Sequence, residues 1–287
     1  DLKEQINQLY FNCLLLQENT GILQLTHETI IEQRKVITSA VKQGLVLESE
    51  LDNLSAEMLR LEQQIIEVKS AIKQALKALE ILSCFTIDEN SELVPPLVGS
   101  ENKDLIFRPE HKLFESQAQL LDATMGLTQK KRMPTLAAFV NAGYGKPGYD
   151  FFNSDMHGFY MVGAQLQWNI WDWKQTNREK QQLSVQKLII DDNRKSFDKN
   201  LTISLNETEL RKQKLEQLIE KDKAIIELQS KISNRSAEQM KNGTKTSADY
   251  LRDLNAEKQA RINLESRKIQ VLQSQVDERM VKGAPLF

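Results

Sequence analysis

The chain has 287 residues, 27% of them charged, and its 38 basic side chains nearly balance its 40 acidic ones. The net charge of −2, without any basic run, gives no electrostatic reason to expect a nucleic-acid partner. Two cysteines, Cys13 and Cys84, are too few for a disulfide scaffold or a paired-cysteine metal site. No uninterrupted run of about 18 apolar residues occurs, so no transmembrane helix is predicted.

Residues 1–83 have the pattern of a helical hairpin. Residues 1–94 contain no proline, and from Leu51 to Leu79 apolar residues recur at steps of three and four, as in a coiled-coil seam. The first helix is expected over 1–43 and the second from about Glu48. Gly44 lies between them, and glycine readily supplies the left-handed conformation that ends a helix. We therefore predict two antiparallel helices with a tight turn at Gly44.

The next part of the chain is less regular. Residues 84–110 have little helical pattern, and one further helix is predicted over 111–132. The composition then changes abruptly, because ten of the 18 aromatic residues lie between Phe139 and Trp173. Residues 133–173 therefore lie in a different environment from the helices on either side of them.

Two runs within this aromatic segment alternate in the manner of β-strands. Over 134–144 one face carries Leu136, Ala138, Val140, Ala142 and Tyr144. Over 159–171 one face carries Tyr160, Val162, Ala164, Leu166, Trp168 and Ile170. Each run is about as long as a tilted strand that crosses a bilayer, and the alternation is that of a transmembrane barrel. The alternative is a soluble two-stranded ribbon packed on the helices.

A second helical hairpin is predicted over 174–282, followed by a short tail at 283–287. The stretch 174–241 contains no proline or glycine, and a break at Gly243 precedes a last helix from about Ser247 to Met280. Its tip resembles the first one in sequence, since residues 51–57 (LDNLSAE) match residues 251–257 (LRDLNAE). A duplicated unit of about 200 residues explains this match. It predicts a counterpart of the aromatic segment before Asp1, in a missing N-terminal part that also holds any signal peptide.

The chain resembles the outer-membrane efflux protein family, the TolC-type channels, as about the last three-quarters of a mature member. The stretch that starts at Arg132-Met133-Pro134-Thr135-Leu136 is similar to the family's strand start, R-x-P-x-L. The stretch Trp168-Asn169-Ile170-Trp171-Asp172 is similar to the strand exit into a long helix. Arg108-Pro109-Glu110 resembles the family's R-P-E, and residues 243–251 resemble its tip motif G-x-x-(S/T)-x-x-(D/E)-x-L.

This resemblance implies a homotrimer in the outer membrane of a Gram-negative bacterium. Each protomer would add strands to one shared β-barrel and long helical hairpins to a periplasmic tunnel of the α-barrel type. Residues 84–110 would form the equatorial band, and the loop 145–158 would face the cell exterior. Outer-membrane lipid, a periplasmic adaptor protein and an inner-membrane pump are the implied partners. The adaptor would dock on tip residues, namely Gly44, Leu45, Val46, Ser49, Gly243, Thr244, Thr246 and Ser247.

The same resemblance implies a gate at the tips. In the family an acidic residue on one tip pairs with a basic residue on the other, and by position Glu50 matches the acid and Lys245 the base. Asp249 matches an aspartate at the narrowest point, where three copies would form a cation-attracting ring. Arg252 departs from the pattern, since the best-known member has a second acidic residue there, so a different ion preference is expected. The alternative is that these charges are solvated at helix ends, where exposed pairs contribute about 0–1 kcal/mol.

Other kinds of site have little support in the sequence. His27, His111 and His157 share no metal-ligand spacing, and a bond between Cys13 and Cys84 would need a shifted helix register. No nucleophile elbow or phosphate loop is present, so neither an enzyme nor a cofactor is predicted. A periplasmic coiled-coil adaptor is the main competing interpretation, and a cytosolic scaffold is the third. The two hairpins and the aromatic strand pair favour the channel.

Overall fold

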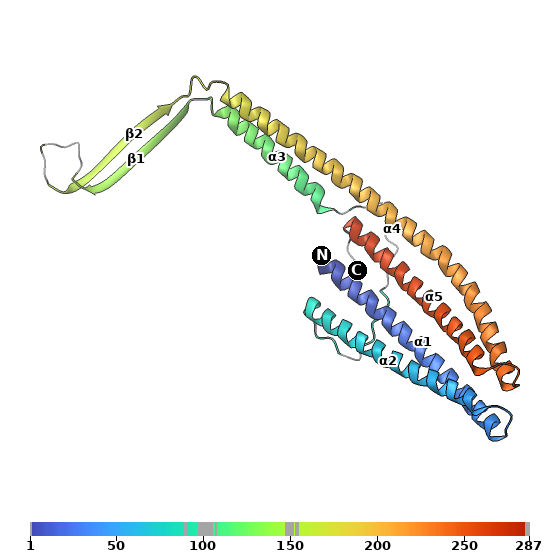
Figure 1. Ribbon diagram of the computed structural model, residues 1–287. Helices are drawn as coiled ribbons and strands as arrows, with labels where there is room; N and C mark the ends of the chain where they lie inside the picture. The colour runs from blue at the N-terminus through green and yellow to red at the C-terminus, as the bar shows by residue number, and fades with distance from the viewer. Residues whose placement is uncertain are drawn as a thin grey trace. The chain divides into compact units, whose positions relative to one another are not determined.

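The computed structural model describes residues 2–88, 91–96, 106, 108–146, 152 and 155–284 (Figure 1). The elements in chain order are α1 (Leu2–Lys42), α2 (Glu48–Ser83), α3 (Pro109–Lys130), β1 (Thr135–Gly145), β2 (His157–Gln167), α4 (Gln175–Lys241) and α5 (Ser247–Lys282). They form two compact units, one of residues 1–107 and 203–287 and the other of residues 108–202, so that α4 belongs to both. No helix of the described residues is long and apolar enough to cross a membrane.

The first unit is built on the hairpin of α1 and α2, with α5 and the end of α4 packed against it (Figure 1). Its main core is made of apolar side chains from all four helices, mostly at positions three or seven residues apart along each helix. Burying one such leucine or isoleucine side chain contributes roughly 1.5–3 kcal/mol. The buried members are Leu23, Ile30, Ile37, Leu54, Leu61, Ala237, Met240, Tyr250, Leu251 and Leu254.

The turns at the two hairpin tips have the same backbone geometry. Gly44 and Gly243 have φ values of 71° and 68°, in the left-handed region. At the first tip Leu45 N donates to Ala40 O at 3.0 Å, and at the second Thr244 N donates to Gln239 O at 2.9 Å. These are the hydrogen bonds of a glycine-ended helix, and they satisfy carbonyls that the last helical turn leaves free. Both turns occur where the sequence places a glycine.

Part of the segment 84–110, which has little helical pattern, lies along α1. Gln17 holds it with both ends of its side-chain amide, because Nε2 donates to Ser91 O at 3.1 Å and Oε1 accepts from Leu93 N at 3.2 Å. Tyr10 Oη donates to Val94 O at 2.5 Å. Residues 89–90, 97–105 and 107 of the predicted equatorial band lie outside the described residues.

The second unit contains the β-hairpin. Strands β1 and β2 pair antiparallel with Leu136 opposite Leu166 and Val140 opposite Val162, so the apolar residues of the two strands share one face. Both faces of the hairpin are largely exposed, so no described helix of its own unit packs on it. Strand β2 ends at Gln167, before the end of the predicted run, and Trp168 Nε1 there donates to Arg132 O at 3.1 Å. Half of the predicted external loop 145–158, namely residues 147–151, 153 and 154, lies outside the described residues.

Helix α3 runs beside the first part of α4 in this second unit, and polar contacts connect them along their length. Lys131 Nζ lies 3.0 Å from Glu179 Oε2, and Lys187 Nζ lies 2.6 Å from Asp122 Oδ1. Helix α3 begins at Pro109, two residues before the expected start, because proline fits the first helical turn where no backbone donor is needed. The strands and these two helices complete the second unit.

Candidate functional site at the hairpin tips

The two tips meet through the first turns of α2 and α5, at the same end of the first unit (Figure 1). Glu50 Oε2 accepts a hydrogen bond from the backbone N of Ser247 at 2.5 Å. Asn53 Nδ2 donates to Ser247 Oγ at 3.2 Å, and one turn further Asn255 Nδ2 donates to Glu57 Oε1 at 3.0 Å. Ser247 is fully buried under these contacts. The carboxylate of Glu50 therefore joins one hairpin to the other.

The start of α5 is suited to binding this carboxylate. The first backbone N–H groups of a helix have no partner inside the helix, and its N-terminal end carries a partial positive charge. Thr246 caps the helix, since its Oγ1 accepts from Asp249 N at 3.1 Å. The neighbouring N–H of Ser247 donates to the Glu50 carboxylate of the other hairpin. A negative charge in such a place contributes typically about 0.3–1 kcal/mol.

Lys245 pairs with an acid that the sequence analysis did not consider. Its Nζ lies 2.5 Å from Asp253 Oδ2 and 2.6 Å from Ser236 Oγ, and Ser236 is also hydrogen-bonded to Asp253. Burial alone would raise the pKa of Asp253, but the hydrogen bonds from Lys245 and Ser236 outweigh it, and the pKa lies below its ordinary value. Within this chain the structure thus does not bring Glu50 and Lys245 together, and Lys245 contacts Asp253 of its own hairpin instead.

Asp249 has a cation beside it. Arg252 Nη2 lies 3.2 Å from Asp249 Oδ1, one helical turn along α5. Both side chains are exposed, so this pair contributes little to stability. It reduces the negative charge that Asp249 presents, and the ion preference expected from Arg252 stays a prediction.

A shallow pocket of about 320 Å³ lies between the tips. Eight of the predicted tip residues line it, whereas Gly44 and Ser49 are exposed outside it and Ser247 is buried. The lining residues are Leu45, Val46, Leu47, Glu50, Met240, Gly243, Thr244, Lys245, Thr246 and Asp249. Leu45 and Leu47 are 70% and 73% exposed, which gives this polar tip an apolar edge.

Comparisons with known proteins give one kind of match. No protein-family model and no curated protein matches the sequence. Solved structures do match. The outer membrane protein VceC of Vibrio cholerae has a TM-score of 0.79 at 12% identity, over 100% of this chain and 70% of that one. The CmeC outer membrane channel of Campylobacter jejuni has a TM-score of 0.72 at 17% identity, over 96% of this chain and 61% of that one.

The MtrE outer membrane channel of Neisseria gonorrhoeae in its open state has a TM-score of 0.77 at 15% identity, over 99% of this chain and 66% of that one. The chain has the fold of the TolC-type outer-membrane channels. It spans roughly two thirds of the length of these proteins. The fold class predicted from the sequence is confirmed: mainly α, with long antiparallel helices and one β-hairpin.

Within this TolC-type fold, sequence reasoning missed several residues that make polar contacts at or near the tips. Asn53 and Asp253 occupy equivalent places in the repeat, and each makes a polar contact at a tip. Glu57 and Glu257 are also equivalent, and both are buried. The signal was present in the match of residues 51–57 to 251–257, which preserves the last glutamate. A buried charged residue needs a partner. A glutamate at the same place in both halves of the repeat therefore indicates a polar contact there.

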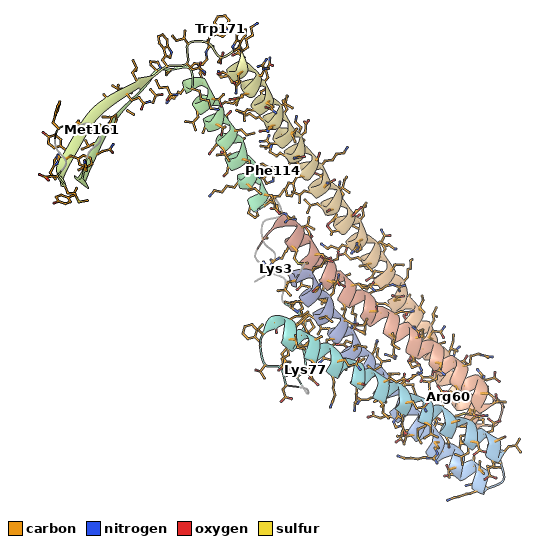
Figure 2. All side chains as sticks on the ribbon, turned by 60° about the vertical axis from the view of Figure 1, so that its left-hand side comes forward. Lys3, Arg60, Lys77, Phe114, Met161 and Trp171 are labelled. Carbon is orange, nitrogen blue, oxygen red and sulfur yellow. The ribbon has the colours of Figure 1, made fainter. Side chains whose placement is uncertain are left out.

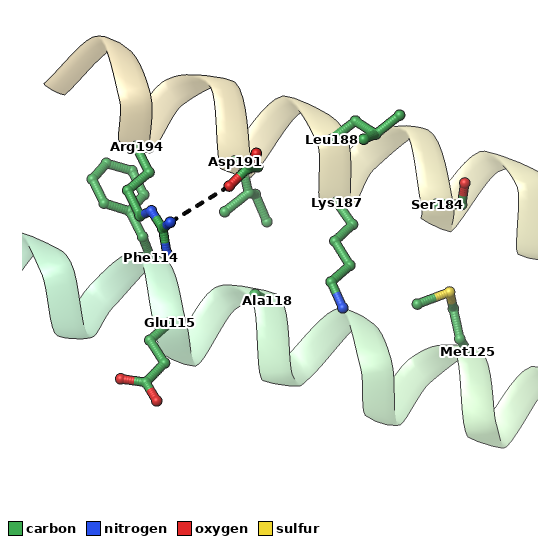
Figure 3. A pocket seen from close by; sticks show the side chains of 10 residues that line it. Phe114, Glu115, Ala118, Met125, Ser184, Lys187, Leu188, Asp191 and Arg194 are labelled. Carbon is green, nitrogen blue, oxygen red and sulfur yellow. Dashed lines mark ion pairs between the residues drawn. The ribbon is translucent and has the colours of Figure 1, made fainter. Parts of the chain in front are cut away.

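The second unit of the TolC-type fold has a pocket of its own, about 490 Å³ in volume, between α3 and α4. Figure 3 shows Phe114 and Met125 at its two ends, with Lys187 reaching toward α3. Asp191 and Arg194 form an ion pair on the α4 side at 3.8 Å. The pocket is mostly apolar with charges at its rim.

Two of the three histidines each lie beside a single acid. His27 Nε2 lies 3.2 Å from Glu62 Oε1, and His111 Nδ1 lies 3.6 Å from Asp198 Oδ1. In the part of the chain that the structure describes, no group of three or more potential ligands could hold a metal ion. Cys13 is buried and Cys84 exposed, both as free thiols.

Proposed function

We propose that this chain is a protomer of an outer-membrane exit duct, which passes small molecules or proteins from an inner-membrane pump to the outside of the cell. The helical hairpins would extend into the periplasm, and the β-hairpin would enter the outer membrane. The channel names of the matching CmeC and MtrE structures agree with this function, although identities of 15–17% establish only the fold.

The exposed apolar face of the β-hairpin is the observation that carries this proposal. Leu136, Val140, Val162 and Leu166 are each 66–71% exposed, and the strand register places them together on one face. An apolar surface of this kind is stabilised by lipid, and the strand edges then need further strands to satisfy their backbone groups. A barrel shared with other copies supplies both.

A stripe of leucines on α3 supports assembly with a second copy. Leu113, Leu120 and Leu127 are spaced by seven residues and are 54%, 67% and 66% exposed. A heptad stripe faces one side of a helix and normally packs against a partner helix. We propose that a neighbouring protomer covers this stripe in a homotrimer.

The tips would form the periplasmic entrance. The exposed Leu45 and Leu47 give an adaptor protein an apolar edge to bind, and the pocket residues Gly243, Thr244 and Thr246 lie beside it. The contact of Glu50 with the Ser247 N–H would hold the entrance closed, because it connects the two hairpins of a protomer. Lys245 would act within its own hairpin.

Single-channel recording in a planar bilayer tests the function. The full-length protein that carries this chain is purified, its mass is measured by light scattering, and it is added to the bilayer. Steady openings from particles of trimer mass are expected. A protein that stays soluble and gives no current would instead favour a periplasmic coiled-coil adaptor, which has helical hairpins but no membrane strands.

A further inference from the structure

The junction between the β-hairpin and the helices of the second unit has a compact structure of its own. It comprises residues 130–135 and 167–180. Besides the bond from Trp168 Nε1 to Arg132 O, Arg132 Nε lies 3.9 Å from Asp172 Oδ2, and Lys131 pairs with Glu179. The two connections are therefore joined to each other where the strands end.

The junction contains a tight turn at residues 172–176, in which the side chains of Trp173 and Lys174 are exposed. Asp172 accepts hydrogen bonds from Lys174 N at 3.1 Å and Thr176 N at 3.2 Å. Trp173 and Lys174 have φ values of 49° and 62°, in the left-handed region, which is unfavourable for residues with a β-carbon. The Asp172 contacts compensate for this conformation, because they hold the backbone of the turn.

All three tryptophans of the chain lie at this junction and are largely exposed. Trp168, Trp171 and Trp173 are 56%, 70% and 77% exposed, and the last two rings contact each other edge to face at 5.8 Å. Figure 2 shows Trp171 where the hairpin meets the helices. Exposed tryptophan is unfavourable in water and is enriched at the boundary between lipid head groups and acyl chains.

The junction is also rich in basic side chains. The junction has six of them against two acidic ones, although the whole chain has a net charge of −2. Lys131 and Arg132 lie beside acids. Lys130, Lys174 and Arg178 are exposed, and the described residues form no ion pair with them. At the far end of the hairpin, residues 146–156 have one lysine and two aspartates. The positive charge is thus confined to one end of the strands.

From this arrangement we propose that the junction binds anionic phospholipid head groups. Lys130, Lys174 and Arg178 contact the phosphates, and the tryptophans lie at the boundary with the acyl chains. The inference rests on the proposed function, because it requires the strands to be in a membrane. Anionic lipid attracts basic residues near its surface, whereas zwitterionic lipid does not. The junction would therefore set the depth of the hairpin in the leaflet on its own side.

Lipid competition in nanodiscs tests the proposal. The full-length protein is reconstituted in phosphatidylcholine, and the association of spin-labelled phosphatidylglycerol is compared with that of spin-labelled phosphatidylcholine. A preference of about ten-fold for phosphatidylglycerol is expected. In the variant K130Q/K174Q/R178Q the preference falls to about one. The variant K112Q/K199Q/K214Q removes three exposed or partly exposed cations elsewhere on the helices and is expected to retain the preference.

Three results would overturn the inference. They are equal association of the two lipids in the unmodified protein, equal loss in both triple variants, and a preference for lipopolysaccharide over phosphatidylglycerol. Tryptophan quenching by brominated phosphatidylcholines gives an independent readout, since the strongest quenching is expected from bromines near the head group. A protein that inserts and conducts without lipid preference contradicts only this inference. One that does not insert contradicts the proposed function itself.

Discussion

Glu50 joins the two hairpins through a backbone N–H group, not through a side-chain cation. Matching residues by position suggested Lys245 as its partner, because a lysine side chain on the opposite tip is the obvious counterion. The preference of Lys245 for Asp253 depends on the turn at Gly243, which brings the start of α5 back beside Ser236 of α4. Such a contact between two helices and a turn cannot be read from spacing alone.

Removal of the Glu50 carboxylate should open the entrance more often. In Glu50→Ala the N–H of Ser247 loses its acceptor at a buried position, which costs about 1–3 kcal/mol. If this cost falls mainly on the closed state, the open probability in planar bilayers rises by about tenfold. Glu48→Ala is the matched control, since Glu48 is an exposed acid in the same helical turn. Equal open probabilities for both variants would exclude Glu50 from the gate.

Tyr250 should make the first unit sensitive to alkali. Burial, with a smaller contribution from the charge of Glu257, raises the pKa of Tyr250 to about 12 from 10.0. The folded pKa exceeds the unfolded one, so the stability that depends on the neutral phenol is complete below pH 10 and is lost as the pH rises to 12.

Tyr250→Phe removes this titration. Denaturant unfolding followed by circular dichroism should show a smaller loss of stability between pH 9 and 11.5 in Tyr250→Phe than in the unmodified protein. The difference is expected to be on the order of 1–2 kcal/mol. Lysines titrate in the same range in both proteins, so only the difference between the two curves is informative. Parallel curves would show that Tyr250 ionises without unfolding the tip.

At the scale of elements, the two strand faces could be predicted but the pairing could not. Alternation assigns each residue to a face because successive side chains point to opposite sides. The register of Leu136 with Leu166 depends on the connecting loop and on the end of β2 at Gln167, neither of which the alternation specifies. The helix ends were clearer, since Gly44 and Gly243 mark turns that few other residues can form.

The pairing creates a specific contact on the face of the hairpin opposite the one that carries Leu136 and Val140. A β-carbon at Gly163 would lie 2.6 Å from Phe139 Cζ, so the ring covers the glycine of the facing strand. Gly163→Ala should displace Phe139 and weaken the hairpin by about 0.5–1.5 kcal/mol. Heat stability of the assembled protein, followed by gel mobility, is expected to fall. Gly158→Ala is the control, because a β-carbon there meets no atom within 4 Å. Equal stability of both variants would contradict the contact.

At the scale of the whole molecule, the sequence indicated long helices but not how the chain divides. Helix α4 has 67 residues and belongs to both units, and no proline or glycine marks the point where one unit passes into the other. Residues 174–282 were therefore predicted as one hairpin. The boundary between the two units depends on which helices pack together. Because α4 runs across this boundary without a break, its sequence carries no local signal of it.

Assembly should depend on the leucine stripe of α3. Leu120→Asp places a charge in the middle of the stripe, where a neighbouring protomer would have to desolvate it. Sedimentation of the purified full-length protein is expected to show monomers in place of trimers. Gln119→Asp adds the same charge at an exposed position about 100° around the helix from Leu120 and should leave the trimer intact. A Leu120→Asp protein that remains trimeric would mean that the stripe faces water or lipid.

The two tip turns share a backbone but differ in what holds them. Val46 occupies the place of Lys245 and packs against the apolar core, and Leu47 occupies the place of the capping Thr246. One turn thus depends on charge and the other on apolar packing. Selection should then act on Lys245 and Asp253 as a pair, because losing either leaves a partly buried charge without its partner. In diverging descendants of this chain the two residues are expected to change together, while Val46 drifts among other apolar residues.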